Sequence, residues 1–204
     1  MIQDKVKEFF RQFPITEYRK GDIVIFAHMS LSSVCYIEAG SVAQYDIDGK
    51  GSRHVLNTFK SKAFFPMSNA INNVDTPYFF EAEGSVKIRK APANMVVKFI
   101  KDNPDVLYDL LQRIYKGTDG LLARMAEMMH GDAESRIMKE LYIMMYRFGS
   151  DDLGKGLRLS RKITETGLAE RTGLARETVS RALGRLKTKK IVEVDNGKYV
   201  ILNQ

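Results

Sequence analysis

The chain has 204 residues, of which 44% are hydrophobic, so it can bury one large core or two small ones and is not a disordered tail. It carries 32 Lys and Arg against 25 Asp and Glu, and the formal net charge of +7 favours a polyanionic partner. The single cysteine, Cys35, excludes an intramolecular disulfide, a four-cysteine iron–sulfur cluster and a Cys-rich zinc module within one chain.

The basic side chains are concentrated in one segment. Residues 1–130 hold 17 basic and 15 acidic side chains, whereas residues 155–190 hold 11 basic and 3 acidic ones, a net charge of +8 in 36 residues. A nucleic-acid-binding surface requires such a local excess. The first residues lack the apolar core of a signal peptide, and no 18-residue apolar run could span a membrane, so we expect a cytoplasmic protein.

Residues 16–92 form short segments rich in β-formers, separated by glycine-containing turns such as Asp48–Gly51. The predicted strands are Asp22–Phe26, Ser33–Ile37, Ser41–Tyr45, His54–Phe59, Tyr78–Ala82 and Val86–Lys90. Several short strands at this spacing predict a sandwich or a small β-barrel.

A long helix is predicted from Pro104 to about Met129, because apolar positions recur there in alternating steps of four and three residues. These positions are Leu107, Leu111, Ile114, Thr118, Leu121, Met125 and Met128. Such a heptad seam predicts pairing with a second copy of the chain. A second stripe, Leu110, Leu122 and Met129, leaves open that the helix lies on the β domain, and both contacts can hold at once.

A domain boundary is predicted near Gly131, because Asp132 can cap a new helix whose apolar stripe begins at Ile137. We expect three parts: a β-barrel domain with flanking helices over 1–103, the long helix over 104–130, and a C-terminal domain over 131–204. Residues 149–156 are predicted to form a loop.

Residues 163–186 predict two short helices joined by a sharp turn at Gly173, with Thr164 capping the first. The second would begin near Arg176 and turn Val179, Leu183 and Leu186 inward. This is the pattern of a helix-turn-helix whose second helix enters the DNA major groove. Residues 191–194 and 199–202, joined by the turn 195–198, predict a β-hairpin that serves as a wing.

The segment Arg176-Glu-Thr-Val-Ser-Arg181, with Gly173-Leu174 before it and the hairpin after it, resembles the winged helix-turn-helix of the cAMP receptor protein and FNR superfamily of bacterial transcription regulators. Tyr18–Asp22 and Ile37–Val42 are similar to the entry of that family's cyclic-nucleotide-binding-type barrel. The resemblance implies an α+β fold: a jelly-roll barrel, a long dimerisation helix and a C-terminal winged helix-turn-helix. It also implies a homodimer that binds an inverted repeat in double-stranded DNA, with RNA polymerase as a further partner to test.

The resemblance assigns base readout to Arg176, Glu177 and Arg181, and phosphate contact to Thr164 and Thr178. Ser180 matches a position where some FNR-like members use a serine in base contact, so the half-site is left open between a TGTGA-like and a TTGAT-like sequence. Arginine can bind guanine bidentately, glutamate can accept from cytosine, and serine or threonine can reach phosphate, which suits these roles.

The phosphate-binding cassette of the family's cyclic-nucleotide binders is missing from this sequence. After Phe64-Phe65 stands Pro66-Met67 in place of Gly-Glu, and Thr76-Pro77-Tyr78 stands in place of Arg-Ser-Ala. Without its arginine or its amides, a buried phosphate would carry an uncompensated charge, which is energetically costly. We therefore do not expect cAMP as the effector.

Aromatic and apolar residues stand at the positions where the family binds its effector. By resemblance the candidate pocket comprises Phe64, Phe65, Met67, Tyr78, Phe80, Leu121 and Leu122. These side chains either fill a core or line a site for a small apolar ligand.

Haem is a second cofactor that other members sense, and five residues could supply axial ligands: His28, Met29, Cys35, His54 and His130. No spacing among them is diagnostic, so we expect neither haem nor another cofactor. An enzyme is not expected, because no catalytic triad, metal-ligand spacing or phosphate loop is present. The alternative function is a protein-interaction module that uses the barrel and the heptad helix.

Overall fold

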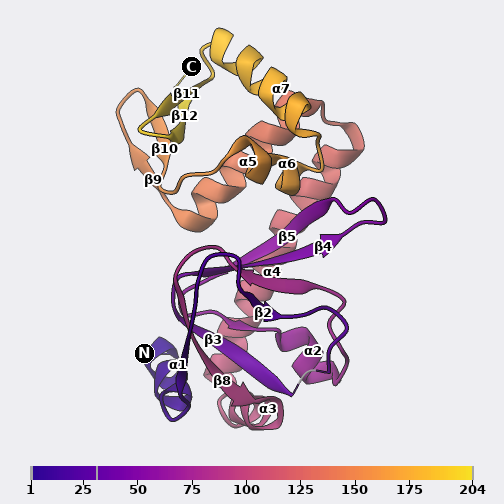
Figure 1. The fold of residues 1–204 in the computed structure, drawn as a ribbon. Coiled ribbons are helices and arrows are strands. Elements are labelled where there is room, and N and C mark those ends of the chain that lie inside the picture. Colours follow the sequence, from indigo (N-terminus) through magenta and orange to yellow (C-terminus); the bar gives the residue numbers. More distant parts are fainter. Residues whose placement is uncertain (1, 31, 204) are drawn as a thin grey trace. The chain divides into compact units, whose positions relative to one another are not determined.

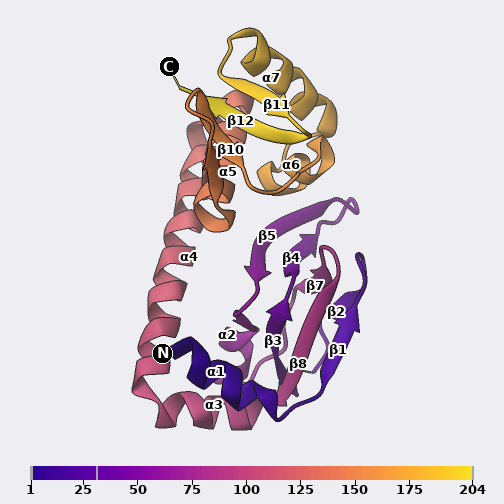
Figure 2. The same ribbon diagram turned by 90° about the vertical axis from the view of Figure 1, so that its left-hand side faces the viewer.

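The computed structural model of the protein describes residues 2–30 and 32–203 (Figure 1). Its internal contacts divide the chain into two compact units, residues 1–114 and 115–204. The division falls within the long helix α4 (Pro104–His130), which runs without interruption, as Figure 2 also shows. None of the described helices combines the length and the apolar character needed to cross a membrane.

The first unit contains eight described strands and three helices before α4. The strands are β1 (Ile15–Tyr18), β2 (Ile23–Ile25), β3 (Ser33–Ala39), β4 (Ser41–Ile47), β5 (Arg53–Lys60), β6 (Phe64–Phe65), β7 (Phe79–Ala82) and β8 (Val86–Pro92), and the helices are α1 (Ile2–Arg11), α2 (Met67–Asn72) and α3 (Ala93–Asp102). All six predicted strands are confirmed. Strands β1 and β6 and helix α2 were not predicted, because each is too short to show a period of its own.

These strands form two four-stranded antiparallel sheets, in the orders β1-β8-β3-β6 and β2-β7-β4-β5. Side chains from both sheets meet in one core, where Ile37, Phe65, Phe80 and Ile88 are almost completely buried. This arrangement confirms the jelly-roll type. Of the two alternatives that the sequence left open, the structure favours the sandwich over a closed barrel, because hydrogen bonding between the described strands leaves two separate sheets.

A second core lies between the first sheet and the helices of this unit. It contains Phe10 of α1, Tyr36 of β3, Phe64, Val96 of α3, and Val106 and Leu110 of α4. Phe10 and Tyr36 stack with their ring centroids 4.9 Å apart. The start of α4 therefore packs on the β domain through Leu110, as its second apolar stripe indicated, whereas Leu122 and Met129 of that stripe are exposed.

The second unit is a helical core with one small sheet. After the end of α4 it contains α5 (Ala133–Phe148), β9 (Ser150–Asp152), β10 (Gly156–Leu159), α6 (Glu165–Thr172), α7 (Arg176–Thr188), β11 (Val192–Asp195) and β12 (Lys198–Leu202). The Asp132 carboxylate caps α5 by accepting a hydrogen bond from the backbone N–H of Ser135 at 2.8 Å. The predicted helices and wing hairpin are confirmed.

The predicted loop over 149–156 is wrong. Residues 150–152 and 156–159 pair as an antiparallel hairpin, which extends the wing to a four-stranded sheet of order β11-β12-β10-β9. Aspartates are poor strand formers, but here Asp151 is paired with Arg158, and Asp152 accepts a hydrogen bond from the N–H of Gly154 at 2.8 Å. These tertiary and turn contacts outweigh the local propensity.

Candidate nucleic-acid interface

Three local features produce the turn between α6 and α7. The Thr164 hydroxyl caps α6 by accepting from the N–H of Gly167 at 3.0 Å. Gly173 ends α6 with φ of 67°, in the left-handed region that favours glycine. The Thr172 hydroxyl donates to the carbonyl of Leu168 at 2.7 Å, so this buried polar group is satisfied. The turn residues therefore act as the sequence predicted.

Helix α7 has one buried and one exposed face. Val179, Ala182 and Leu183 are fully buried against α5 and the wing sheet, in a core that also contains Leu141 and Leu159. The residues assigned to base readout are all exposed on the same helix: Arg176, Glu177, Ser180 and Arg181. Of the residues assigned to phosphate contact, Thr164 is exposed and Thr178 is half-buried. The structure thus brings the four base-reading candidates together on one accessible surface.

Basic side chains near the two ends of α7 differ in their partners, and one of them, Lys189, directly follows the helix. The Glu134 carboxylate at the start of α5 binds Arg185 Nε at 2.6 Å and Lys189 Nζ at 2.7 Å. The hydrogen bond from Lys189, followed by that from Arg185, lowers the pKa of Glu134. Arg176 and Arg181 form no ion pair within the described part of the chain, so their guanidinium groups are available for another anion. The C-terminal half of α7 is tied to α5, and its N-terminal half is accessible.

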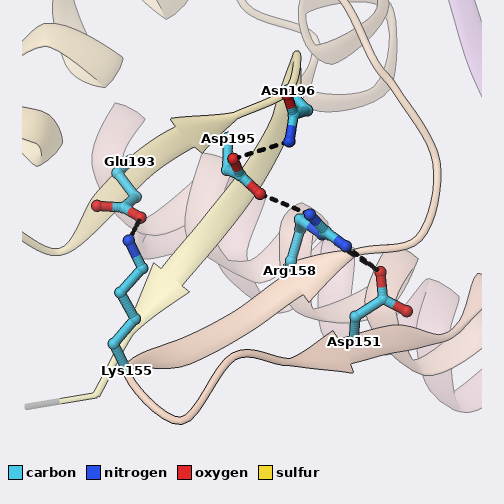
Figure 3. Close-up of polar contacts among 6 residues, drawn as sticks. All are labelled: Asp151, Lys155, Arg158, Glu193, Asp195 and Asn196. Carbon is cyan, nitrogen blue, oxygen red and sulfur yellow. Dashed lines mark hydrogen bonds and ion pairs between the residues drawn. The ribbon is translucent and has the colours of Figure 1, made fainter.

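A polar network covers the outer face of the wing sheet (Figure 3). Arg158 of β10 binds Asp151 Oδ2 through Nη2 at 3.1 Å and Asp195 Oδ2 through Nη1 at 2.5 Å. Hydrogen bonds to Asp195 and Asp151 raise the pKa of the Arg158 guanidinium. On the same face Lys155 forms an ion pair with Glu193 of β11. This network was not predicted, because Asp151 and Lys155 lie in a segment interpreted as a loop, and so the pairing of β9 and β10 with the wing hairpin was not expected.

Glu140 forms a buried ionic contact that the sequence analysis also missed. Its carboxylate receives two hydrogen bonds from Arg124 of α4, at 2.6 and 2.9 Å, and lies 3.9 Å from Arg171 of α6. Glu140 is 1% exposed. A glutamate within the apolar stripe that contains Ile137, Leu141 and Met144 was the signal that could have revealed a buried partner. This contact fixes the end of α4 to α5.

The predicted dimer seam is exposed in the single chain. Its large apolar residues, Leu107, Leu111, Ile114, Leu121, Met125 and Met128, are between 37% and 57% exposed, and Thr118 is exposed as well. Tyr108 and Tyr115 beside the seam are more exposed still, at 65% and 68%. The Met128 Cε atom lies 3.9 Å from the place that a Cβ added at Gly173 would occupy. Pairing of this face with a second copy stays a prediction.

The structure distributes the candidate effector pocket over several places. Phe65 stacks on Phe59 and Phe80, with centroids 4.8 and 5.1 Å apart, and Tyr78 packs against this core. Phe64 and Met67 belong to the second core. Leu121 and Leu122 lie in the other unit and are exposed.

The candidate haem ligands differ in their surroundings. Cys35 is fully buried, and burial raises the pKa of its thiol to about 12. His54 Nε2 lies 3.0 Å from Asp48 Oδ2. Met29, His130 and His28 are exposed, and His28 has a φ of 61°. Within residues 2–30 and 32–203, no group of three or more His, Cys, Asp or Glu side chains could hold a metal ion.

Comparisons with protein families match both parts of the chain. Residues 15–103 match the cyclic nucleotide-binding domain, and residues 135–204 match the Crp-like helix-turn-helix domain. The chain is 25% identical to the global nitrogen regulator of Nostoc sp., over 98% of this chain and 94% of that protein. It is 23% identical to the fumarate and nitrate reduction regulatory protein of Yersinia pestis, over 90% of this chain and 72% of that protein.

Solved structures with the same fold include a c-di-GMP-responsive global regulator from Xanthomonas campestris, with a TM-score of 0.82 and 15% identity over 98% of this chain and 99% of that one. A CooA variant from Carboxydothermus hydrogenoformans has the same TM-score, with 18% identity over 97% of this chain and 86% of that one. Both of the relatives reported above by sequence are named as regulators. The chain belongs to the cAMP receptor protein and FNR superfamily of DNA-binding transcription regulators.

Proposed function

We propose that the protein regulates transcription by binding an inverted-repeat DNA site as a homodimer, with one α7 helix in the major groove of each half-site. In this proposal Arg176, Glu177, Ser180 and Arg181 contact base edges, and Thr164 and Thr178 contact phosphates. Two symmetry-related helices would enter successive major grooves about 34 Å apart.

The exposed face of α7 carries this proposal. Two arginines with no carboxylate partner among the described residues stand on a helix whose other face is fully buried. A bidentate arginine–guanine contact contributes about 1–3 kcal/mol of discrimination against the wrong base. The exposed apolar seam of α4 supports the dimer, because a contiguous apolar face of this kind is typical of an interaction surface.

We further propose that cAMP does not control this binding. Pro66 lacks a backbone N–H, and Met67, which stands where the ribose-binding glutamate is expected, is buried beside Phe64. Thr76 is fully buried and its hydroxyl accepts from the N–H of Tyr78 at 3.3 Å. An apolar side chain and a neutral, internally bonded hydroxyl offer little compensation for a cyclic phosphate. The neighbouring aromatic stack supports a filled core at this place.

Selection of bound duplexes from a random DNA pool tests the proposal, using protein purified without added ligand and repeating the selection with cAMP. We expect the same inverted repeat to be enriched in both. Enrichment of an isolated half-site or of no sequence would contradict the dimeric readout. Enrichment that needs cAMP would contradict the second part of the proposal while leaving the first intact.

A further inference from the structure

The Arg158 side chain connects β9 and β11, two strands that are not neighbours in the wing sheet. It lies on β10 opposite Val200 of β12, and its guanidinium extends across β12 to Asp195 at the end of β11 (Figure 3). Its other partner, Asp151, lies on β9 on the opposite side. The Arg158 side chain is 24% exposed, so its ionic contacts are partly shielded from water. One side chain thus connects all four strands of the wing sheet.

Asp195 links Arg158 to the turn of the wing hairpin. It is the last residue of β11, and the turn follows with Asn196 and Gly197, whose φ angles are 49° and 75°. Two successive positive φ angles are typical of a two-residue type I′ hairpin turn. Asp195 Oδ2 binds Arg158, while its Oδ1 accepts a hydrogen bond from Asn196 Nδ2 at 3.1 Å. The same carboxylate therefore holds both the sheet and the turn.

A lysine from outside the hairpin lies against this turn. A Cβ added at Gly197 would lie 3.3 Å from Lys162 Cε and 3.4 Å from Lys162 Nζ. Lys162 is exposed and stands two residues before Thr164, the cap of α6. The turn thus combines an accessible ammonium group with a backbone that carries no side chain at Gly197, a combination that allows close approach of an anion.

We infer that Arg158 is a positioning residue for DNA binding: through Asp195 it fixes the wing turn so that Gly197 and Lys162 together contact a DNA phosphate. The inference rests on the proposed function, because the anion is a phosphate of the bound duplex. Asp195 itself repels phosphate by its charge. Its favourable role is to order the turn. The charge of Asp195 weakens DNA binding whereas the ordered turn strengthens it, so the two effects can be separated by measurement.

The same face of the sheet provides a matched control. Glu193 lies on the same strand two residues before Asp195, has the same 35% side-chain exposure, and is also paired with one basic residue, Lys155. It lies opposite Val200, away from the turn. Asp195→Ala and Glu193→Ala each remove one negative charge and one ion pair, but only Asp195→Ala releases the turn.

The test measures affinity for the selected inverted-repeat duplex as a function of salt, together with amide hydrogen exchange of residues 196–198 in the free protein. Charge alone predicts tighter DNA binding by both variants. The positioning role predicts that Asp195→Ala binds several-fold more weakly than Glu193→Ala, with a log–log salt slope smaller by about 0.9, the change for one lost phosphate contact. It also predicts faster exchange at the turn in Asp195→Ala only.

A double-variant cycle separates the turn from the rest of the interface. In a Lys162→Met background, Asp195→Ala should cause a smaller further loss of affinity than in the wild type, because the Lys162 part of the contact that it positions is already absent. Equal affinities and equal turn exchange for the two single variants would overturn the inference. If Asp195→Ala unfolds, Asp195→Asn and Glu193→Gln give the same comparison. A wild-type protein that selects no DNA would instead contradict the proposed function, whereas slow turn exchange in Asp195→Ala would overturn the positioning role by itself.

Discussion

The family's two binding regions have opposite surroundings in this protein. At the nucleotide-cassette positions of the first unit, Met67 and Thr76 are buried, and the adjoining Phe65 lies in a stack of aromatic rings. At the DNA-reading positions of the second unit, Arg176 and Arg181 are exposed on α7. Burial of an apolar side chain in the first region stabilises the fold, because the side chain loses contact with water. An arginine in the second region must stay hydrated until it contacts DNA.

The two regions illustrate that a fold by itself does not assign a ligand. Both units retain the family's architecture, but binding depends on a few side chains placed on it. In the function proposed above, the first unit lacks the polar groups that a cyclic phosphate would need, and the second unit carries the charged groups that would contact base edges. Each region can therefore be perturbed separately.

Phe65→Ala is expected to have the largest effect. Phe65 is fully buried between Phe59 and Phe80, so its truncation should destabilise the first unit by about 3–5 kcal/mol, the usual range for a buried aromatic ring. Differential scanning calorimetry measures the loss, with Phe26→Ala as control because Phe26 is 52% exposed. A loss no larger than that of the control would show that the ring borders a void instead of a packed core.

Arg181→Ala should act on sequence discrimination and not on folding. Its side chain is exposed, so the melting temperature should stay within the range of surface substitutions. Binding to the selected site should weaken by about 1–3 kcal/mol relative to binding of unrelated DNA. Competition binding with the two duplexes gives this ratio. An unchanged ratio would refute the assignment of Arg181 to base readout, and dimer formation should be unaffected.

The smallest effect is expected at the tip of the β4–β5 hairpin. The hydrogen bond from His54, followed by those from the N–H groups of Ser52 and Lys50, lowers the pKa of Asp48 from 3.8 to about 2. Because the folded-state pKa is depressed, this carboxylate stabilises the fold above its unfolded-state pKa, and the contribution is lost as pH falls toward 2.

His54→Ala should raise the pKa of Asp48 toward its ordinary value, with little effect on stability at neutral pH, because both side chains are more than one-third exposed. NMR titration of the Asp48 carboxyl carbon measures the shift. An unchanged pKa would show that the backbone N–H groups alone hold the carboxylate. The lowered pKa of Asp48 would then depend on the backbone of the turn and not on a side-chain partner.

Patterns that repeat along the chain were sufficient to predict most of the fold. Four predictions that rest on local features were confirmed: the long helix α4, the cap at Asp132, the left-handed turn at Gly173 and the amphipathic helix α7. The order of the strands in the two sheets of the β domain was not predicted, because strand pairing joins residues far apart in the sequence.

The base-reading candidates could be named from the sequence because they follow one another within six residues of a single helix. The sequence by itself therefore determined most of the element types and the chemistry of α7, since these depend on local spacing, and it indicated the family through the resemblance carried by Arg176–Arg181. Only the tertiary structure decided that Glu140 is paired with Arg124 and that Arg158 reaches Asp195, 37 residues away. Ion pairs form where packing brings two charged side chains together. The relative position of two such residues depends on the turns and strands of the chain between them.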